Sequence, residues 1–278
     1  MKRSTTLILA ALLVLAASCK DMALHYYNLG IDAMEKDDPV SAAEYFEKSL
    51  THRQSDPDIH FNLGVAYHAI GKYDDAIEQF KIALDAYPAD PILHFNMGET
   101  YAAMGSSQAA AREYELAIRM NDDFPEALTA YGKLLMESGS YESAEANLIE
   151  AITLRPSYDE AYVYLGWVYA KTGKVHQATF YLYRGLRSNP NSIEGRLGLG
   201  IVFYEKGLFD DAIAEYEKVV VRDKENPDAH LGIGRCYTAK GQMRLAKEFI
   251  NKALELQTPY PEAHKAMVDM HFKERGGD

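Results

Sequence analysis

The chain has 278 residues, of which 47% are hydrophobic and 25% are charged, a composition that is ordinary for a globular protein. Its formal net charge is −12, and so acidic a chain repels phosphate backbones, which argues against nucleic-acid binding. Only two cysteines occur, Cys19 and Cys236, which are too few for a disulfide framework or a set of zinc ligands.

The first 19 residues have the three parts of a secretory signal. Basic Lys2 and Arg3 are followed by an apolar stretch over residues 7–17, and small residues at 16–18 precede Cys19. A helix that crosses a bilayer needs roughly 20 apolar residues, which is more than this stretch contains. We therefore predict that residues 1–18 are a cleaved signal peptide rather than a permanent membrane span.

The run Leu15-Ala16-Ala17-Ser18-Cys19 resembles the lipobox of bacterial lipoproteins, although Ala16 stands where leucine is more common. The resemblance implies lipidation of Cys19, with residues 19–22 as a lipidated cysteine and a short tether. Several acyl chains would hold the protein stably at a membrane. The residue after Cys19 is not the aspartate that retains enteric lipoproteins in the inner membrane, which favours the outer membrane, facing the periplasm. An ordinary cleaved signal peptide is the alternative.

Beyond the tether the sequence repeats every 34 residues. An apolar residue followed by glycine recurs at this spacing as Leu29-Gly30, Leu63-Gly64, Met97-Gly98, Tyr131-Gly132, Leu165-Gly166, Leu199-Gly200 and Ile233-Gly234. A second glycine follows seven residues after each of these except the first, at Gly71, Gly105, Gly139, Gly173, Gly207 and Gly241. Such regularity indicates a stack of equivalent structural units.

The pattern resembles the tetratricopeptide repeat, whose signature also has Tyr and Phe at the places of Tyr67 and Phe80 and a recurrent alanine at the place of Ala76. The resemblance implies an all-α fold, a right-handed superhelical solenoid of seven helical hairpins with a C-terminal capping helix. The seven repeats are expected at residues 23–56, 57–90, 91–124, 125–158, 159–192, 193–226 and 227–260, and the capping helix and tail at 261–278.

The small residues have a physical role in such a hairpin. Gly64 and Ala76 have almost no side chain, so two helices can cross closely there while Phe80 fills the space beside them. The second glycine, as at Gly71, ends the first helix by accepting a left-handed backbone. Each hairpin buries one face only against its neighbour, so stability requires the whole stack.

The residues that bear reactive groups are periodic as well. His60, His94, His230 and His264 occupy the same place in different repeats. Equivalent places lie two helix packings of roughly 8–10 Å apart, whereas a zinc ion needs its nitrogen ligands at about 2 Å. We interpret these histidines, and Cys236, as packing residues. Acids recur at the second place of several first helices, where they favour the helix dipole: Asp58, Glu126, Glu160, Glu194, Asp228 and Glu262. We predict no enzyme, no metal and no cofactor.

In tetratricopeptide stacks the first helices line a concave groove, and the resemblance implies which positions face it. In repeats one to three these are Tyr27, Phe61 and Phe95 at position 5, Asn28, Asn62 and Asn96 at position 6, and Ile31, Val65 and Glu99 at position 9. An asparagine amide offers a donor and an acceptor that match a peptide unit, and the aromatic row adds apolar contact. Because asparagine is common at that position throughout the family, contact with a ligand and a structural role are both open.

The later repeats present different residues to the groove. Those expected to contact a partner are Lys133, Met136, Tyr164, Trp167 and Tyr204. A tryptophan among Tyr and Met has the composition of a binding hot spot, and Trp167 is the only one in the chain. The alternative is that Trp167 packs against a neighbouring helix. The lysines and asparagines with which related repeats clamp the C-termini of chaperones are missing from their places.

We therefore expect a protein-interaction scaffold of the bacterial envelope, held at the membrane by a lipid on Cys19, that binds peptide segments or helices of protein partners in its groove. Pilotin-like lipoproteins, which assist secretin assembly in type IV pili, have the same architecture. A subunit of a machine for polysaccharide synthesis or export, and an adaptor for peptidoglycan hydrolases, are the alternatives.

Overall fold

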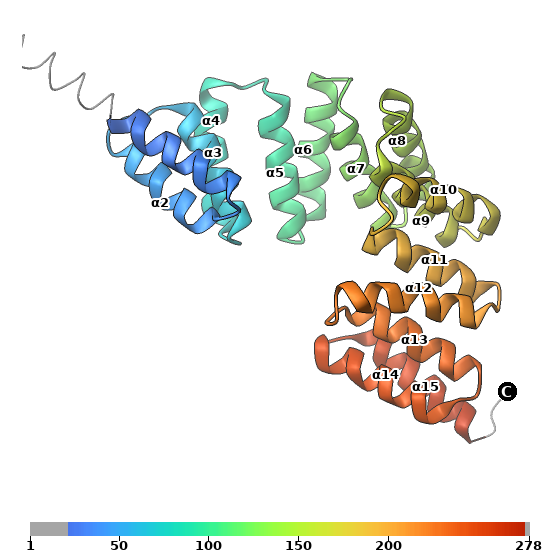
Figure 1. Cartoon of the computed structure of the whole chain (residues 1–278). Helices are drawn as coiled ribbons and strands as arrows, with labels where there is room; N and C mark the ends of the chain where they lie inside the picture. The colour runs from blue at the N-terminus through green and yellow to red at the C-terminus, as the bar shows by residue number, and fades with distance from the viewer. Residues whose placement is uncertain (1–21, 276–278) are drawn as a thin grey trace, which may run out of the picture. The chain divides into compact units, whose positions relative to one another are not determined.

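The computed structural model describes residues 22–275, so the predicted signal peptide, Cys19 and residues 276–278 lie outside it. The described residues form α-helices joined by short turns, and no strand occurs between residues 22 and 275 (Figure 1). The all-α fold is thus confirmed. The chain divides into two compact units, Met1–Leu134 and Leu135–Asp278.

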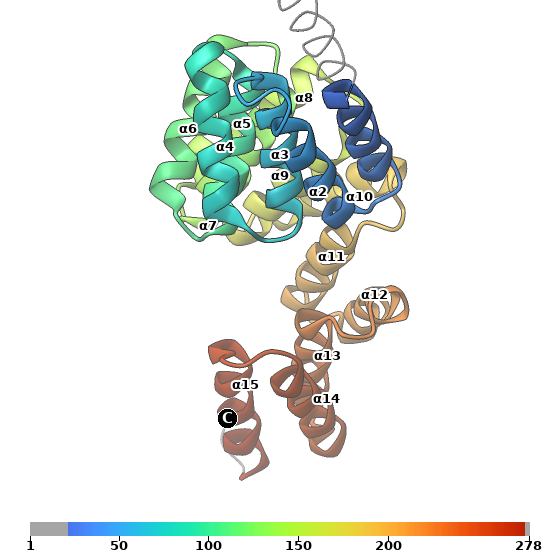
Figure 2. The same cartoon turned by 90° about the vertical axis from the view of Figure 1, so that its left-hand side faces the viewer.

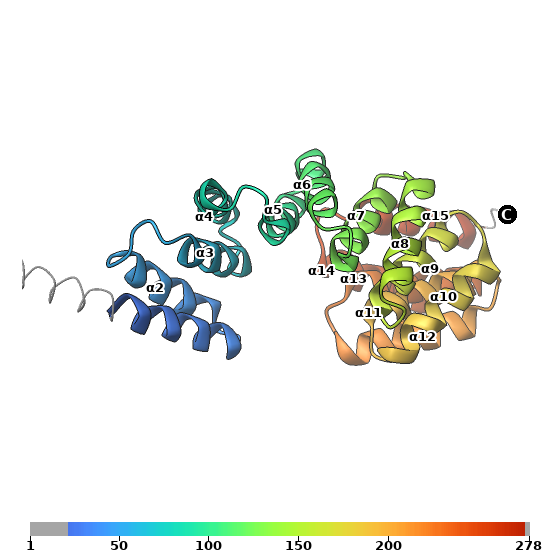
Figure 3. The same ribbon diagram turned by 90° about the horizontal axis from the view of Figure 1, so that it is seen from above.

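In the first unit, successive helices pair into hairpins, with α3 packed on α4 and α5 packed on α6 (Figures 1 and 3). The helices of this unit are residues 22–35, α2 (Pro39–Leu50), α3 (Pro57–Ala69), α4 (Tyr73–Ala86), α5 (Pro91–Ala103), α6 (Ser107–Met120) and the first part of α7 (Pro125–Glu137), which continues into the second unit.

The second unit continues the same arrangement. Its further helices are α8 (Tyr141–Leu154), α9 (Asp159–Lys171), α10 (Val175–Ser188), α11 (Ile193–Glu205), α12 (Phe209–Arg222), α13 (Pro227–Ala239), α14 (Met243–Leu256) and α15 (Pro261–Glu274). Figure 2 shows α13, α14 and α15 side by side, and each of these three helices contacts the other two.

The turn inside a hairpin depends on one residue with a left-handed backbone. Glycine fills this place in six turns, as at Gly71 (φ 77°) and Gly173 (φ 73°). A Cβ added at either position would meet no atom within 4 Å, so the backbone conformation, rather than crowding, requires glycine. In the first repeat Asp37 takes this place with φ 58°, which short polar residues tolerate better than other side chains.

The other row of glycines lies where the two helices of a hairpin cross. A Cβ at Gly64 would lie 2.6 Å from Cε1 of Phe80, and one at Gly98 would lie 2.6 Å from Cε1 of Tyr114. Both rings are buried, with exposures of 0% and 2%. The helices therefore approach as closely as glycine permits, and the large side chain fills the remaining space, as the sequence predicted.

Several first helices begin with a hydrogen-bonded cap that the sequence analysis did not identify. Asp56 and Asp90 each precede a proline, and each carboxylate accepts a hydrogen bond from the backbone N–H two residues further on, over 3.1 and 2.8 Å. This satisfies an amide that has no partner within its helix. The acids at the second helical place, such as Asp58, lie in the first turn, where the helix dipole favours negative charge.

Helix α15 closes the second unit as the predicted cap. Met270 is 1% exposed and packs in one apolar cluster with Ile250 of α14. Its other face is open, since Val268 and Phe272 are 67% and 62% exposed. Between residues 22 and 275, no helix has the length and apolar character needed to cross a membrane.

Candidate partner-binding site

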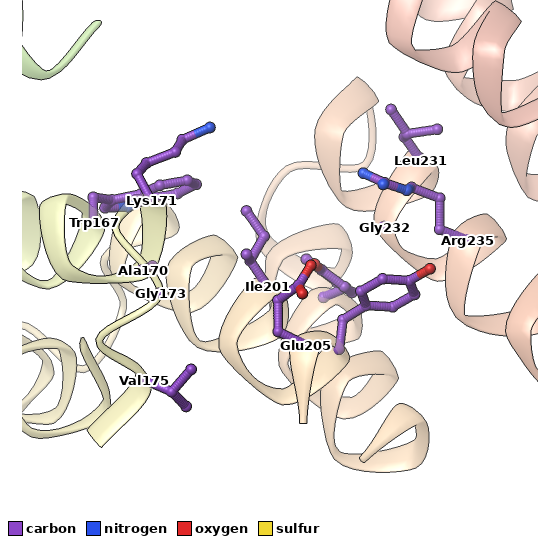
Figure 4. A pocket seen from close by; sticks show the side chains of 12 residues that line it. Trp167, Ala170, Lys171, Gly173, Val175, Ile201, Glu205, Leu231, Gly232 and Arg235 are labelled. Atoms are coloured by element: carbon purple, nitrogen blue, oxygen red, sulfur yellow. The ribbon is translucent and has the colours of Figure 1, made fainter. Parts of the chain in front are cut away.

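A cleft of about 470 Å³ lies in the second unit, lined mainly by the first helices of three consecutive hairpins, α9, α11 and α13 (Figure 4). Trp167 lies at one side, Ile201 in the middle and Leu231 at the other side. Two of the predicted site residues, Trp167 and Tyr204, line this cleft. First-helix side chains of three successive repeats thus line one hollow.

Trp167 packs against the neighbouring helix, which is one of the two roles that the sequence left open. Its Nε1–H donates to the backbone carbonyl of Glu194 at the start of α11 over 2.9 Å. A Cβ at Gly198 would lie 3.2 Å from the same nitrogen, so glycine at that position makes room for the indole. Trp167 therefore packs against the neighbouring helix and, being half-buried, still presents part of its ring to the cleft.

Two cations border the cleft, and each lies over an aromatic ring. Lys171 Nζ is 5.9 Å from the centroid of the Trp167 ring, and Arg235 Cζ is 5.4 Å from that of Tyr204. These distances fit cation–π contacts, which orient a long basic side chain while leaving its charge in place. Ile201 and Arg235 lie at repeat position 9, where the resemblance places groove-facing residues, but they were not among the residues expected to contact a partner. Lys171 was not predicted to face the groove. It occupies repeat position 13, which faces the groove in this kind of repeat, so position alone could have identified it.

The remaining predicted residues of the later repeats differ in how far their side chains are exposed to solvent. Lys133 is exposed and Met136 is half-buried, both on α7. Tyr164 is only 7% exposed, so its side chain offers little surface to a partner. Nearly every side chain in the middle of α9 is buried, and Tyr164 is one of them.

In the first unit, the aromatic row at position 5 packs on the second helix of its own hairpin. The ring of Tyr27 lies 5.8 Å from that of Phe46, and the ring of Phe61 lies 6.1 Å from that of Phe80. Phe95 repeats the contact with Tyr114 at 6.1 Å. All three members of the row are half-buried, so they support the core and present only their remaining surface to a ligand.

Amide protons of Asn62 and Asn96 are already used in hydrogen bonds within the protein. Asn62 Nδ2 donates to the Asp58 carbonyl over 2.8 Å and to the Tyr27 hydroxyl over 3.2 Å, which uses both of its protons. Asn96 Nδ2 donates to the carbonyl four residues back over 2.8 Å. The expectation that each amide offers both donor and acceptor is therefore wrong for Asn62, whose oxygen alone is available. Asn28 is exposed.

The position-9 residues of the first unit are also partly occupied. Ile31 and Val65 are half-buried and pack against the apolar clusters of their hairpins. Glu99 accepts a hydrogen bond from the hydroxyl of Tyr114. The predicted first-unit site is thus a partly exposed row whose members also hold the hairpins together.

One member of the histidine row, His60, links consecutive repeats. His60 is 7% exposed, and its Nδ1 lies 2.7 Å from Oε1 of Gln79, which is 19 residues later on the second helix of the same hairpin. Its Nε2 lies 2.9 Å from the carbonyl of Gln54, six residues earlier and at the end of the preceding repeat. One side chain therefore ties a second helix to the preceding inter-repeat turn.

An arginine makes the same two contacts, with a residue 19 positions later and a carbonyl six positions earlier. Arg196 donates to Glu215 over 2.7 Å, 19 residues later, and to the carbonyl of Pro190 over 2.8 Å, six residues earlier. His94 Nδ1 lies 2.7 Å from Oε2 of Glu113, but its Nε2 has no hydrogen-bond partner among residues 22–275, so His94 makes only the contact within its own hairpin. The sequence carried a signal for that contact, because the residues 19 positions apart are His–Gln, His–Glu and Arg–Glu in these three repeats.

His264 departs from the prediction that all four histidines are packing residues. His60, His94 and His230 are buried, but His264 is exposed on α15. No helix follows α15 among the described residues, so nothing there supplies the partner that position 4 contacts in other repeats.

Residues 22–275 contain no group of three His, Cys, Asp or Glu residues placed to hold a metal ion. Cys236 is fully buried in the apolar cluster of α12 and α13, and burial raises the pKa of its thiol to about 12. It is therefore a packing residue, as predicted, because the reactive thiolate is disfavoured there.

Models of the tetratricopeptide repeat match residues 27–91, 95–146, 132–173, 159–192 and 203–269, which together make up well over half of the chain. No enzyme family is among these matches. No curated protein sequence is significantly similar to the chain.

Solved structures with the same fold include a tetratricopeptide repeat protein from Parabacteroides merdae, at 17% identity and a TM-score of 0.74, over 90% of this chain and 99% of that one. PilW, a widely conserved type IV pilus biogenesis factor, matches at 22% identity and 0.66, over 76% and 98%. PilF of Pseudomonas aeruginosa matches at 23% identity and 0.63, over 77% and 97%. At these identities the likeness is one of fold.

Proposed function

This chain belongs to the tetratricopeptide repeat family, and we propose that it is a non-catalytic scaffold that binds a segment of a partner protein in the cleft between α9, α11 and α13. The observation that carries the proposal is the cleft itself, where Trp167, Tyr204 and Ile201 supply apolar surface and Lys171 and Arg235 supply charge. Aromatic residues and arginine dominate the binding energy of protein interfaces.

The cleft suits a protein segment that extends over several repeats. Its side chains come from three consecutive hairpins, so a bound segment would contact several repeats at once. A volume of about 470 Å³ accommodates a few side chains of such a segment.

We further propose that the scaffold works in the bacterial envelope. The support is the signal-like sequence of residues 1–18 and the lipobox-like run that ends at Cys19, all outside the described residues. A lipid on Cys19 would leave only a short tether before the helix of residues 22–35, which would hold the first repeat near the membrane surface. An outer-membrane position facing the periplasm fits the absence of aspartate after Cys19.

Within the envelope, we propose a role in assembling a pilus or secretin complex. The fold likeness to PilW, a type IV pilus biogenesis factor, and to PilF of Pseudomonas aeruginosa supports this choice. The cleft described above supplies a surface on which an assembly subunit can be held.

Site-specific crosslinking tests the cleft. A photoreactive amino acid at Lys171 or Ile201, which face the cleft, should give covalent adducts with an envelope protein in living cells. Lys171 is preferable to Trp167 because replacing it leaves the Trp167–Glu194 hydrogen bond intact. The control carries the same group at Lys247, which is exposed on α14 and outside the cleft. Identical adducts at cleft and control positions, or none at either, would rule out the cleft as the docking site.

Fractionation tests the membrane anchor. The variant Cys19→Ser should move from the membrane fraction to the soluble periplasmic fraction, because no other segment between residues 22 and 275 can span a bilayer. The wild-type chain treated in parallel is the reference. Membrane association that is unchanged in Cys19→Ser would end the lipoprotein proposal while leaving the scaffold proposal standing.

A further inference from the structure

The charge of the cleft is opposite to that of the chain. The whole sequence carries a formal net charge of −12, yet the cleft lining contains Lys171 and Arg235 and a single acid, Glu205. Figure 4 shows Lys171 beside Trp167 on one side, Arg235 on the other, and Ile201 with Glu205 between them. Two exposed cations therefore face one hollow from opposite sides.

Neither cation is neutralised by a neighbour. Among residues 22–275 no ion pair includes Lys171 or Arg235, whereas Lys174, Lys206 and Lys240 nearby are each bonded to an oxygen of another residue. The contacts that Lys171 and Arg235 make are with the faces of aromatic rings. A ring face attracts the cation but supplies no carboxylate, so both charges remain available to a ligand.

The apolar part of the cleft lies between the two charges. Trp167 donates its indole N–H to the Glu194 carbonyl, and Ile201 is half-buried in the middle of the cleft. A rigid aromatic wall next to an aliphatic side chain suits an apolar anchor residue of a partner. Since Glu205 also stands between the cations, it disfavours a second acid at the centre of the cleft and favours acids toward the sides.

We propose that the occupant of this cleft is an acidic protein segment, with an apolar side chain seated between Trp167 and Ile201 and carboxylates directed at Lys171 and Arg235. This inference rests on the proposed function, because it specifies the chemistry of the segment that the scaffold binds. A basic segment would face two like charges, and a neutral one would leave both without a counter-charge, which makes complementarity the basis of selection.

The experiment selects peptides and then exchanges charges. The purified full chain in detergent is panned against a random peptide library, and the affinity of each enriched peptide is measured with its Asp and Glu residues intact and replaced by Asn and Gln. The test variant is Lys171→Glu/Arg235→Glu. The matched control is Arg244→Glu/Lys247→Glu, which makes the same charge change at exposed positions of α14 outside the cleft.

We expect the enriched peptides to carry Asp or Glu close to an aromatic or aliphatic residue. The cleft variant should bind them at least about tenfold more weakly, with little change in the control, since interfacial charge pairs commonly contribute at least that much. A peptide with Glu replaced by Lys should bind the cleft variant better than it binds the wild type. Circular dichroism of both variants establishes that they are folded.

Two other outcomes separate the inference from the function it rests on. Peptides that lose affinity in Trp167→Phe but bind Lys171→Glu/Arg235→Glu like the wild type would overturn the acidic segment and leave the scaffold function standing. If no selected peptide is affected by Trp167→Phe or by the charge reversal, the cleft is not a docking site, and the proposed function fails together with this inference.

Discussion

Replacing Arg196 by alanine should destabilise the sixth hairpin, where Arg196 of α11 pairs with Glu215 of α12, and weaken its link to the fifth repeat. Glu215 is only 7% exposed, and its carboxylate accepts hydrogen bonds from Arg196 over 2.7 Å and from Lys218 over 2.6 Å. Removing one partner of a buried ion pair costs about 3–5 kcal/mol. Because Lys218 remains and the Arg196 side chain is itself 21% exposed, we expect the lower value of about 2–3 kcal/mol. The carbonyl of Pro190 also loses its donors.

The loss should be local, so it is measured by hydrogen exchange in α11 and α12 together with urea unfolding of the full chain. A repeat stack can unfold in parts, and a single global free energy of unfolding does not describe it. Arg244→Ala, at an exposed arginine of α14, is the control. Arg196→His should lose less stability than Arg196→Ala, because histidine makes the corresponding two contacts at the same repeat position in His60. Adding Glu215→Gln to Arg196→Ala should restore part of the stability by removing the buried charge. Wild-type protection in Arg196→Ala, or no recovery in the double variant, would refute the reasoning.

Three further predictions concern buried groups. Gly64→Ala should lower the stability of the first unit by about 1–3 kcal/mol, because the added methyl meets the buried ring of Phe80; an unchanged urea midpoint would contradict the close helix crossing. In a chain carrying Cys19→Ser, Cys236 should react with a thiol reagent at mildly alkaline pH only after unfolding, since burial raises its pKa to about 12; fast reaction of the folded chain would exclude that burial. Burial lowers the pKa of His68, so its contribution to stability is present above its unfolded pKa of about 6.5 and is lost as the pH falls toward the folded value. A His68→Gln variant should therefore have a flatter decline of stability with acid, and identical curves for both chains would count against this.

The fold follows from the sequence because the repeats pack alike, with glycine at the helix crossing and a large apolar or aromatic side chain beside it. Gly64 permits a close crossing, Phe80 fills it, and Gly71 turns the chain, so the 34-residue spacing alone locates each hairpin. Where the local solution changes, the pattern is less informative. Asp37 takes the left-handed place without being glycine, and His264 lies at a packing position without a partner.

The candidate site was only partly predictable, because contacts between repeats decide which side chains remain available. Trp167 was predicted from its residue type and its repeat position, but its hydrogen bond to the Glu194 carbonyl depends on how α9 packs on α11. The same holds for Asn62, whose amide protons are used by its own helix and by Tyr27. The repeat position of Lys171 indicated that it faces the groove, but only the structure shows its ammonium over the Trp167 ring at the edge of a cleft.

The position of Trp167 also gives the protein a built-in optical reporter. It is the only tryptophan among 278 residues, it lines the cleft, and its indole N–H is bonded across to α11. Excitation at the red edge of protein absorption therefore selects this one ring over the many tyrosines. Its emission wavelength responds to the polarity around the indole, and its intensity responds to groups that approach it. Occupation of the cleft, or loosening of α9 from α11, can thus be followed in the unlabelled protein, in solution or in a membrane.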